Sequence, residues 1–527
     1  MQQTRTIILF LIVCCIACRA KAQKPPEPLL LSAYQDRVKA VWAAQILGAM
    51  LGWPFEHKAA SVSWIDHLSD TITHAPVDDD WYYEMVALRA FEQYGIDMSV
   101  QQLGKQWLQN AAGSWGSSEQ ARLLMLRGIM PPDCGHPRYN KLWHTIGPQF
   151  SSELYGMLAP GLPNVAGSLA RKYTHINGYA EGADGGVFVA GLVSLGFTEK
   201  DTRTIVRKAA QLIHPASPYR QCLDMVIRLA AAGKSAPEVF SAIEKRWRIE
   251  YPASNNAVAN GGIVAACVWF GNGSFLKTVN LAFQAADFTD ADCNAASAGA
   301  VVAAMHGMSA LPAGMVRQLG DRIIGRQLGG VILTPAVNES IAQLAARTTA
   351  IGLQLLKNKG MVIAGSRIKL IAEPVHTQPA ELFRLEALTR FWNPEWKLRN
   401  PGFGGAGGGM PGLRGITYLE DSVLATYPRD EVKGVLLTRT ITLNGQKELR
   451  LSVGVDSMRA WRCMVFINNY KKFDQLMEGP ASGRGWKTIK IDLTEFAHQQ
   501  VTIRIYQRVL IPGKVSGNAY WKDLVIQ

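Results

Sequence analysis

Two groups of aspartates have the residue type and spacing to bind a cation. Residues 78–80, in "VDDDWYYEM", are three consecutive aspartates, and Asp287, Asp290 and Asp292 lie close together in "DFTDADCNAAS". Each group stands just before a run that is helical in character. One aspartate there is ordinary, because its side chain caps the first backbone N–H groups and faces the positive end of the helix dipole. Three carboxylates are more than capping needs.

A divalent cation would explain why so much negative charge gathers at two helix starts. Neighbouring carboxylates repel one another, and bringing the two groups together raises that repulsion unless a cation lies between them. Mg²⁺, Mn²⁺ and Ca²⁺ prefer oxygen ligands, and no matching set of His and Cys indicates zinc. Side chains two residues apart diverge by about 200° within a helix, so two of them reach one ion only where the chain bends at a helix start. Taken singly, each group is better explained as a solvated cap.

The elements that must position these carboxylates are helices. Over residues 30–357, apolar residues recur at every third or fourth position, with Gly, Pro and Asn between the segments. In the segment 81–95, Trp81, Met85 and Leu88 fall on one face, and a glycine ends the helix. We therefore expect an all-helical bundle over 30–357.

The sequence changes character after about residue 360. Residues 358–415 include the glycine-rich "PGFGGAGGGMPG" and are predicted to connect two domains. A formal G-x-G-x-x-G match there lacks the strand-to-helix context of a dinucleotide site. Beyond it, short alternating runs predict an all-β sandwich over 416–527, with Asn444-Gly445 as a hairpin-type turn. The predicted strands are 434–443, 448–455, 461–467, 486–493, 501–509 and 520–526.

The N-terminus is typical of a secretory signal peptide over residues 1–22. Arg5 is followed by an apolar stretch, and small residues precede a cleavage point near Ala22, so a secreted or periplasmic location is expected. Elsewhere, no run approaches the ~18 apolar residues of a transmembrane segment, and 261–271 is predicted to be a buried helix.

Cysteine spacing and charge exclude other classes. The five cysteines after the signal are widely spaced and form no C-x-x-C pair, which predicts buried thiols rather than disulfides or a zinc site. The net charge is +13, but Lys and Arg are scattered, so no nucleic-acid partner is expected. The excess indicates a solvated surface, with weak attraction to anionic glycans or a membrane surface as the alternative.

The helical region resembles the ADP-ribosylglycohydrolase family. That family is an all-helical fold that holds two divalent cations between a Thr-Asp-Asp-Thr motif and a distal Asp-x-Asp-Thr motif. "DDDW" (78–81) resembles the first motif and "DADC" (290–293) the second. The likeness spans roughly residues 33–350, and the segment 36–56 resembles the family's opening helix through three matching residues: Gly48, Gly52 and Glu56.

Four residues depart from the family's motifs. Asp78 in place of threonine keeps an oxygen ligand and adds charge. Trp81 replaces the last threonine of the first motif, and its ring could stack on a substrate or simply pack. Cys293 replaces the threonine of the second motif, and a thiol is a poor partner for a hard cation. Ala49 takes the place of an aspartate in the opening helix.

The resemblance implies a site and a reaction. The reaction would be hydrolysis of an N- or O-glycosidic bond at an anomeric carbon, dependent on one or two Mg²⁺ or Mn²⁺ ions, with Glu56 as the candidate for proton transfer. The implied catalytic set is Glu56, Asp79 and Asp292, and the implied metal ligands are Asp78, Asp79, Asp80, Asp290, Asp292 and Cys293. His175 is either a ligand contact or a hydrogen-bonded structural histidine.

Two functions stay open at the level of sequence. The first is a secreted metal-dependent hydrolase acting on an ADP-ribosyl or related glycosyl group of a small molecule or glycan. The alternative is a catalytically degenerate protein that binds carbohydrate through its sandwich. The β-rich region resembles the galactose-binding-like modules of secreted carbohydrate-active enzymes. Trp461, Trp486 and Trp521 are expected in its core, and any of them left exposed would suit stacking on a sugar.

Overall fold

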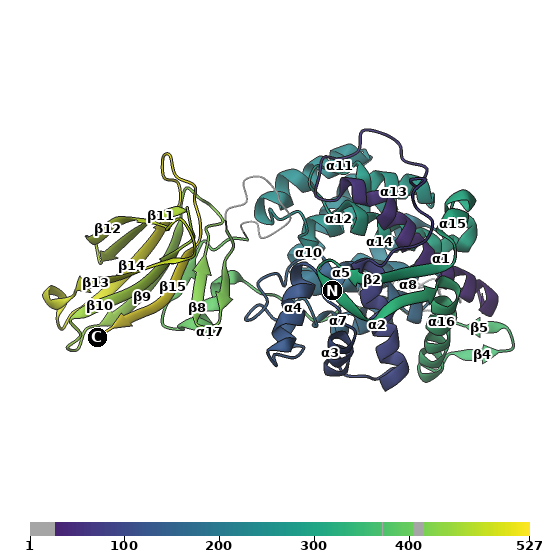
Figure 1. Cartoon of the computed structure of the whole chain (residues 1–527), viewed down its shortest axis with the longest axis horizontal. Coiled ribbons are helices and arrows are strands. Elements are labelled where there is room, and N and C mark those ends of the chain that lie inside the picture. The colour runs from purple at the N-terminus through teal and green to yellow at the C-terminus, as the bar shows by residue number, and fades with distance from the viewer. Residues whose placement is uncertain (1–26, 372, 404–414) are drawn as a thin grey trace, which may run out of the picture.

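The computed structural model describes residues 27–371, 373–403 and 415–527. A helical region and a β-sandwich lie side by side along the long axis of the molecule (Figure 1). The predicted signal peptide lies outside the described residues, as does most of the glycine-rich stretch.

The helical region is built around helix α14, Ala291–His306, which is buried along nearly its whole length. Helix α1, Leu31–Gly52, packs along it, and α2, Asp79–Tyr94, brings in the first aspartate group. The other helices are α3 (Val100–Gln109), α4 (Gly116–Leu126), α5 (Gly147–Phe150), α6 (Glu153–Leu158), α7 (Pro163–Thr174), α8 (Glu181–Gly196), α9 (Thr202–Gln211), α10 (Pro218–Ala231), α11 (Ala236–Ile243), α12 (Ala257–Gly271), α13 (Phe275–Phe283), α15 (Ala313–Leu319), α16 (Ile341–Asn358) and α17 (Thr389–Trp392).

The helix predicted over 81–95 is confirmed. Its predicted apolar face is buried, and Gly95, at a φ of 82°, ends α2. The segment 261–271 belongs to α12 and is buried, as expected. The five cysteines after the predicted signal are free and buried. Within the described residues no single helix is long and apolar enough to cross a membrane; one bent pair, Ala291–Ala310 with Ala313–Leu319 at 96°, passes on length and composition.

Two small sheets interrupt the helical region. Strands β2 (Arg322–Leu328) and β3 (Val331–Ser340) form an antiparallel hairpin that sequence analysis did not predict. A second sheet has the order β1-β5-β4, with β1 at Leu29–Leu30, β4 at Val362–Ala364 and β5 at Arg367–Lys369.

The C-terminal region is a sandwich of two five-stranded antiparallel sheets, with strand orders β13-β10-β15-β8-β7 and β12-β11-β14-β9-β6. The strands are β6 (Lys397–Arg399), β7 (Tyr418–Glu420), β8 (Val423–Thr426), β9 (Val435–Thr442), β10 (Glu448–Val455), β11 (Ala460–Ile467), β12 (Tyr470–Glu478), β13 (Gly485–Asp492), β14 (Gln500–Arg508) and β15 (Ala519–Ile526). The prediction of a hairpin at Asn444-Gly445 is wrong, because β9 and β10 belong to different sheets and the turn carries the chain across the sandwich.

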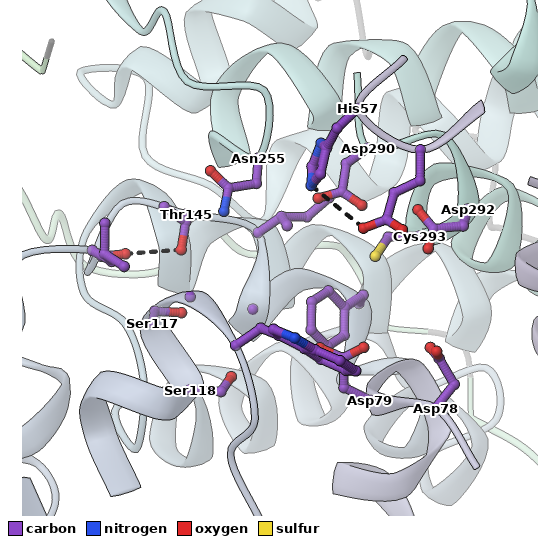
Figure 2. Close-up of a pocket in the computed structure, with 17 residues that line it drawn as sticks. His57, Asp78, Asp79, Ser117, Ser118, Thr145, Asn255, Asp290, Asp292 and Cys293 are labelled. Carbon is purple, nitrogen blue, oxygen red and sulfur yellow. Dashed lines mark hydrogen bonds and ion pairs between the residues drawn. The ribbon is translucent and has the colours of Figure 1, made fainter. Parts of the chain in front are cut away.

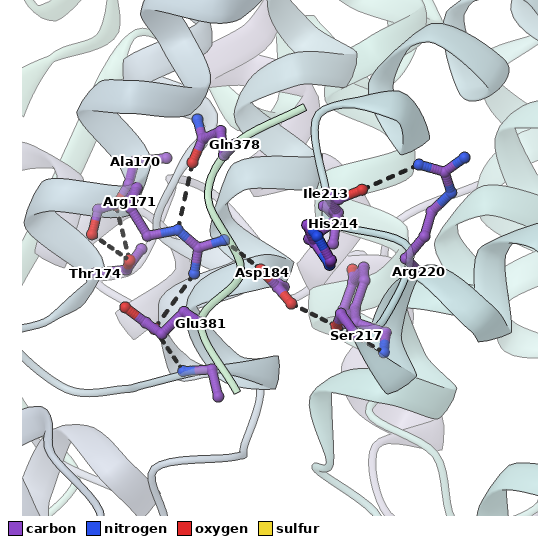
Figure 3. Close-up of polar contacts among 12 residues, drawn as sticks. Ala170, Arg171, Thr174, Asp184, Ile213, His214, Ser217, Arg220, Gln378 and Glu381 are labelled. Carbon is purple, nitrogen blue, oxygen red and sulfur yellow. Dashed lines mark hydrogen bonds and ion pairs between the residues drawn. The ribbon is translucent and has the colours of Figure 1, made fainter. Parts of the chain in front are cut away.

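The stretch before the sandwich is held against the helical region by a polar cluster (Figure 3). Arg171 of α7 forms ion pairs with Asp184 of α8 and with Glu381. The Nε2 of His175 lies 2.7 Å from the other oxygen of Glu381, and Gln378 also accepts from Arg171. Further along, β6 pairs with β9, so a sandwich strand lies inside the range expected to connect the two domains.

Candidate metal centre

The two aspartate groups meet at one cavity of about 500 Å³. Figure 2 shows Asp78 and Asp79 on one side of it and Asp290 and Asp292 on another, with the sulfur of Cys293 between them. Glu56 also lines this cavity. Segments separated by more than two hundred residues thus face one another, as the cation hypothesis required.

The first group is placed by the start of α2. Asp78 is the N-cap residue, and its side chain accepts a hydrogen bond from the backbone N of Asp80 at 3.3 Å. Asp79 lines the cavity, whereas Asp80 is buried and does not belong to its lining. The three carboxylates nevertheless offer one oxygen each within 4.8 Å of one another. The capping interpretation is therefore correct for Asp78 and leaves its two neighbours unexplained.

The second group is placed by the start of α14. Asp290 stands at the N-cap position but makes no side-chain cap hydrogen bond. Its backbone N instead donates to the Oδ1 of Asn260 on α12 at 3.3 Å, and Asn294 donates to the same oxygen at 2.7 Å. An amide from a neighbouring helix thus fixes the turn, and the carboxylates of Asp290 and Asp292 are left to face the cavity.

Glycines let α1 approach α14 at this point. A Cβ on Gly52 would lie 2.5 Å from the Cα of Asp292, and one on Gly48 would lie 2.7 Å from the carbonyl oxygen of Ala295. Real Cβ atoms do not occur at such distances, so only glycine permits this packing. The two glycines of the resemblance therefore set where Asp292 stands.

The carboxylates are buried and incompletely satisfied. The Oδ1 atoms of Asp80, Asp290 and Asp292 are buried without a hydrogen-bond partner among the described residues. Burial first, and then neighbouring aspartate charges, raise the pKa of Asp79, Asp80 and Asp292 well above the ordinary range. Such clusters are costly unless a cation or protons neutralise them. The aspartate oxygens are hard donors and fit Mg²⁺ or Mn²⁺.

Cys293 belongs to the cluster by position. Its sulfur lies within 4.8 Å of oxygens of Asp80 and Asp292, and the thiol donates to the Oδ2 of Asp80 at 3.4 Å. Burial, followed by the nearby aspartate charges, raises the pKa of this thiol well above its usual value. In this arrangement Cys293 is a neutral donor to a carboxylate.

Glu56 stands at the mouth of the cluster, after a short 3₁₀ turn, Trp53–Phe55, that continues from α1. One carboxylate oxygen each of Glu56, Asp290 and Asp292 lie within 4.8 Å of one another, close enough to hold one metal ion. The side chain of Glu56 is 41% exposed. Its Oε1 lies 3.4 Å from the Nε2 of His57. Burial first, and then the charge of Asp290, raise the pKa of Glu56 to about 7.

The opposite wall was not predicted from sequence. It carries hydroxyl and amide groups on the side away from the aspartates (Figure 2). The Oγ of Ser117 and the Oδ1 of Asn255 are buried without a hydrogen-bond partner in the described chain. These uncharged groups suit a polyhydroxylated ligand; the residues of this wall are Trp115, Gly116, Ser117, Ser118, Thr145 and Asn255.

The unpredicted hairpin β2–β3 packs against two segments that form this site. Ala75 and Ile323 form a parallel bridge just upstream of the first aspartates, with the backbone N of Ile324 donating to Ala75 O at 2.9 Å. At the hairpin tip, a Cβ on Gly329 would lie 2.9 Å from the indole of Trp115. The hairpin therefore contacts both the segment that leads into α2 and Trp115 of the cavity lining.

Residues 30–350 match the family model described as ADP-ribosylglycohydrolase. The chain belongs to that family. No curated protein matches the chain. A solved structure titled "ADP-ribosylglycohydrolase-related protein complex" is 18% identical with a TM-score of 0.38 and covers 62% of this chain and 98% of its own. CBM51 from Clostridium perfringens GH95, in complex with methyl-galactose, is 19% identical with a TM-score of 0.16, over 20% of this chain and 70% of its own. Likenesses this slight carry no argument about ligands.

Membership of the ADP-ribosylglycohydrolase family supports a hydrolase, and the acidic cluster agrees with the metal dependence typical of the family. The other residues singled out in the sequence lie apart from the cavity. Asp287 accepts from the backbone N of Ala60 at 2.8 Å, and His175 belongs to the polar cluster with Glu381. Trp81 is fully buried and its indole donates to Pro76 O at 3.2 Å, so it packs rather than stacks on a substrate.

Proposed function

We propose that this chain is a metal-dependent hydrolase that cleaves an N- or O-glycosidic bond in the cavity at the starts of α2 and α14. The observation that carries the proposal is the meeting of three remote segments, with buried carboxylate oxygens that have no partner in the described chain. We assign this chemistry to a domain over residues 30–357, joined through 358–415 to a sandwich domain over 416–527.

One or two Mg²⁺ or Mn²⁺ ions would be held by the aspartates of the two groups: Asp78, Asp79, Asp80, Asp290 and Asp292. When bound, such an ion stabilises developing negative charge and orients hydroxyl groups or water. The thiol of Cys293 keeps its proton and donates a hydrogen bond to the Oδ2 of Asp80.

Glu56 is proposed to carry the proton of the reaction. It belongs to neither aspartate group, and its partly exposed carboxyl group can reach a leaving group in the cavity. A water molecule replaces the leaving group at the anomeric carbon, Glu56 gives a proton to the departing oxygen or nitrogen, and the proton that the water loses restores Glu56. His57, 3.4 Å away, holds the orientation of that carboxyl group.

The substrate is proposed to be an ADP-ribosyl or related glycosyl group. The wall of serine, threonine and asparagine opposite the aspartates offers hydrogen bonds to sugar hydroxyls, and Trp115 offers a flat surface beside them. Because residues 1–22 are predicted to be a signal peptide, we propose that the protein meets this substrate outside the cytoplasm.

A second function is favoured by one observation. Cys293 stands where the family motif has threonine and hydrogen-bonds a predicted ligand oxygen of Asp80. A cluster weakened in this way would bind a glycoside without hydrolysing it. The protein would then be a catalytically degenerate carbohydrate-binding member of the family.

Titration calorimetry of Mn²⁺ into chelator-treated protein, followed by a substrate panel, separates the two functions. We expect binding heat that disappears in Asp79→Ala and Asp292→Ala and persists in the control Asp287→Asn, whose carboxylate lies outside the cavity. The panel contains ADP-ribosyl-arginine, ADP-ribosyl-serine and aryl glycosides. Glu56→Gln should reduce turnover by about 10²–10⁴-fold and keep Mn²⁺ binding. Absence of binding heat at millimolar Mn²⁺, or binding of glycosides without any turnover, would favour the second function.

A further inference from the structure

One row of residues crosses the whole sheet β13-β10-β15-β8-β7. Trp486 pairs with Gly454, Gly454 with Tyr520, Tyr520 with Ala425 and Ala425 with Tyr418. Residues paired in register place their side chains on the same face of a sheet. Tyr418, Ala425 and Tyr520 belong to a buried cluster separate from the core of the sandwich, so this row lies on the outer face.

Trp486 provides a flat, accessible ring at the far end of the row. Its side chain is 44% exposed, whereas Trp461 and Trp521 are fully buried in the sandwich core. A Cβ on Gly454 would lie 3.2 Å from the Cζ3 of Trp486, so the ring rests on the sheet where a glycine leaves room for it. The guanidinium of Arg484 lies 5.9 Å from the ring centroid of Trp486, and the part of the indole that stays exposed suits the C–H face of a sugar ring.

Groups that can hydrogen-bond hydroxyls surround this ring and continue along the row. Thr488 and Asp523 are exposed, and both pair with Ser452 of β10. Ser452 is two residues from Gly454, the partner of Trp486, so these groups lie one position along the same face. The guanidinium of Arg484 lies 3.6 Å from the ring centroid of Tyr520 and donates to the Oε2 of Glu420 at 2.8 Å. An aromatic platform among charged and hydroxyl groups is the surface that saccharide recognition needs.

The other end of the row meets the helical region next to the candidate active site. Glu420 lines a hollow of about 310 Å³ together with Tyr139 and Lys141 of the helical region. The ammonium of Lys141 lies 5.2 Å from the ring centroid of Tyr418. The next residue, Leu142, packs against the outer-face cluster and also lines the catalytic cavity. The hollow and the cavity therefore lie on either side of one short segment.

We propose that this face, which we call the glycan strip, binds a saccharide chain whose end is presented to the catalytic cavity. The glycan strip consists of Trp486, Arg484, Glu420 and Lys141, and the cations of Arg484 and Lys141 cover the buried rings of Tyr520 and Tyr418. Strands lie about 4.8 Å apart, so the four steps from β13 to β7 span roughly 19 Å, a length that suits a chain and not a single sugar. Figure 1 shows β8 next to the helical region and β13 at the far side of the sandwich. Trp486 is the single exposed ring of the glycan strip and is set among polar groups, so the strip offers too little apolar area for a protein partner.

Affinity electrophoresis of the full mature chain in gels containing soluble polysaccharide tests this proposal without measuring activity. The probes are arabinoxylan, arabinogalactan, mixed-linkage β-glucan and mucin. We expect at least one of them to retard the wild type, and Trp486→Ala to weaken that retention by tenfold or more. The matched control is Tyr470→Ala, because Tyr470 is a 65% exposed ring on the other sheet of the same sandwich.

Two results would overturn the glycan strip: no retardation of the wild type by any of the four polysaccharides, or retention by Trp486→Ala equal to that of the wild type. Far-ultraviolet circular dichroism of each variant confirms that the sandwich is folded. A chain that binds through Trp486 but hydrolyses none of its bound glycans would contradict the proposed hydrolysis and leave the strip intact.

Discussion

Replacing Gly52 with alanine should disrupt the metal centre without touching a ligand. A Cβ there would lie 2.5 Å from the Cα and 2.8 Å from the backbone N of Asp292, about 1 Å short of ordinary contact. Both atoms are backbone, so α1 and α14 must separate by a comparable amount. Metal–ligand distances tolerate only about 0.2 Å, and a misplacement of about 1 Å commonly costs about 10²-fold in function. We therefore expect Mn²⁺ affinity to fall by at least tenfold.

Urea unfolding and Mn²⁺ calorimetry on the same preparations measure both effects. Overpacking of this kind lowers the free energy of unfolding by about 1–3 kcal/mol. The control is Gly314→Ala on α15, where an added Cβ meets no atom within 4 Å and the better helix propensity of alanine should stabilise by up to about 1 kcal/mol. If Gly52→Ala binds Mn²⁺ as the wild type does and unfolds like the control, the close approach of α1 to α14 does not position Asp292, and the reasoning fails.

Three further outcomes are expected. Trp115→Ala should raise KM about tenfold or more and leave Mn²⁺ affinity unchanged, because the ring lines the cavity but offers no metal ligand; Trp64→Ala, an exposed indole outside the lining, should change neither. Mn²⁺ at a hundred times its Kd should raise the free energy of unfolding by about 2.7 kcal/mol, and thermal melts of Asp292→Asn with and without Mn²⁺ should show this gain abolished. Burial raises the pKa of Glu153 to about 8, so its contribution to the free energy of unfolding is full at acid pH and is lost as pH rises through 8. Urea unfolding between pH 6 and 9 should therefore show that this free energy declines less steeply in Glu153→Gln than in the wild type. Parallel profiles would contradict this.

The parts of the site that carry charge could be predicted from sequence. The aspartates can be recognised by their number and by their position before predicted helices. The match of Gly48, Gly52 and Glu56 to the family's opening helix indicated that this helix belongs to the same site. The capping interpretation was correct for Asp78, whose side chain does accept a backbone N–H. Only tertiary structure could show that Asp290 occupies the same kind of position without capping, because Asn260 of another helix holds its backbone instead.

The uncharged wall could not be predicted in the same way. Ser117 and Asn255 are ordinary residues in sequence, and what distinguishes them is a buried polar atom without a partner in the described chain. The hairpin β2–β3 does carry a signal in the sequence, Gly329-Gly330 between two runs that contain apolar residues, but it lies inside a region of helical periodicity. At Asn444-Gly445 the turn chemistry is real, with Gly445 at a φ of 110°, but a local turn does not decide which sheet the next strand joins.

The stability of the metal centre depends on groups that carry no charge. Asn260 fixes the turn before α14, the hairpin β2–β3 fixes the approach to α2, and Gly52 fixes the separation of α1 and α14. None of these neutralises a carboxylate, so without a cation or bound protons the packing of the alanine- and glycine-rich helices must hold several mutually repelling side chains in place. A bound cation would remove that repulsion, which acts at the start of α14, where Gly52 of α1 meets Asp292. Loss of metal and loss of packing at Gly52 should therefore weaken the same interface.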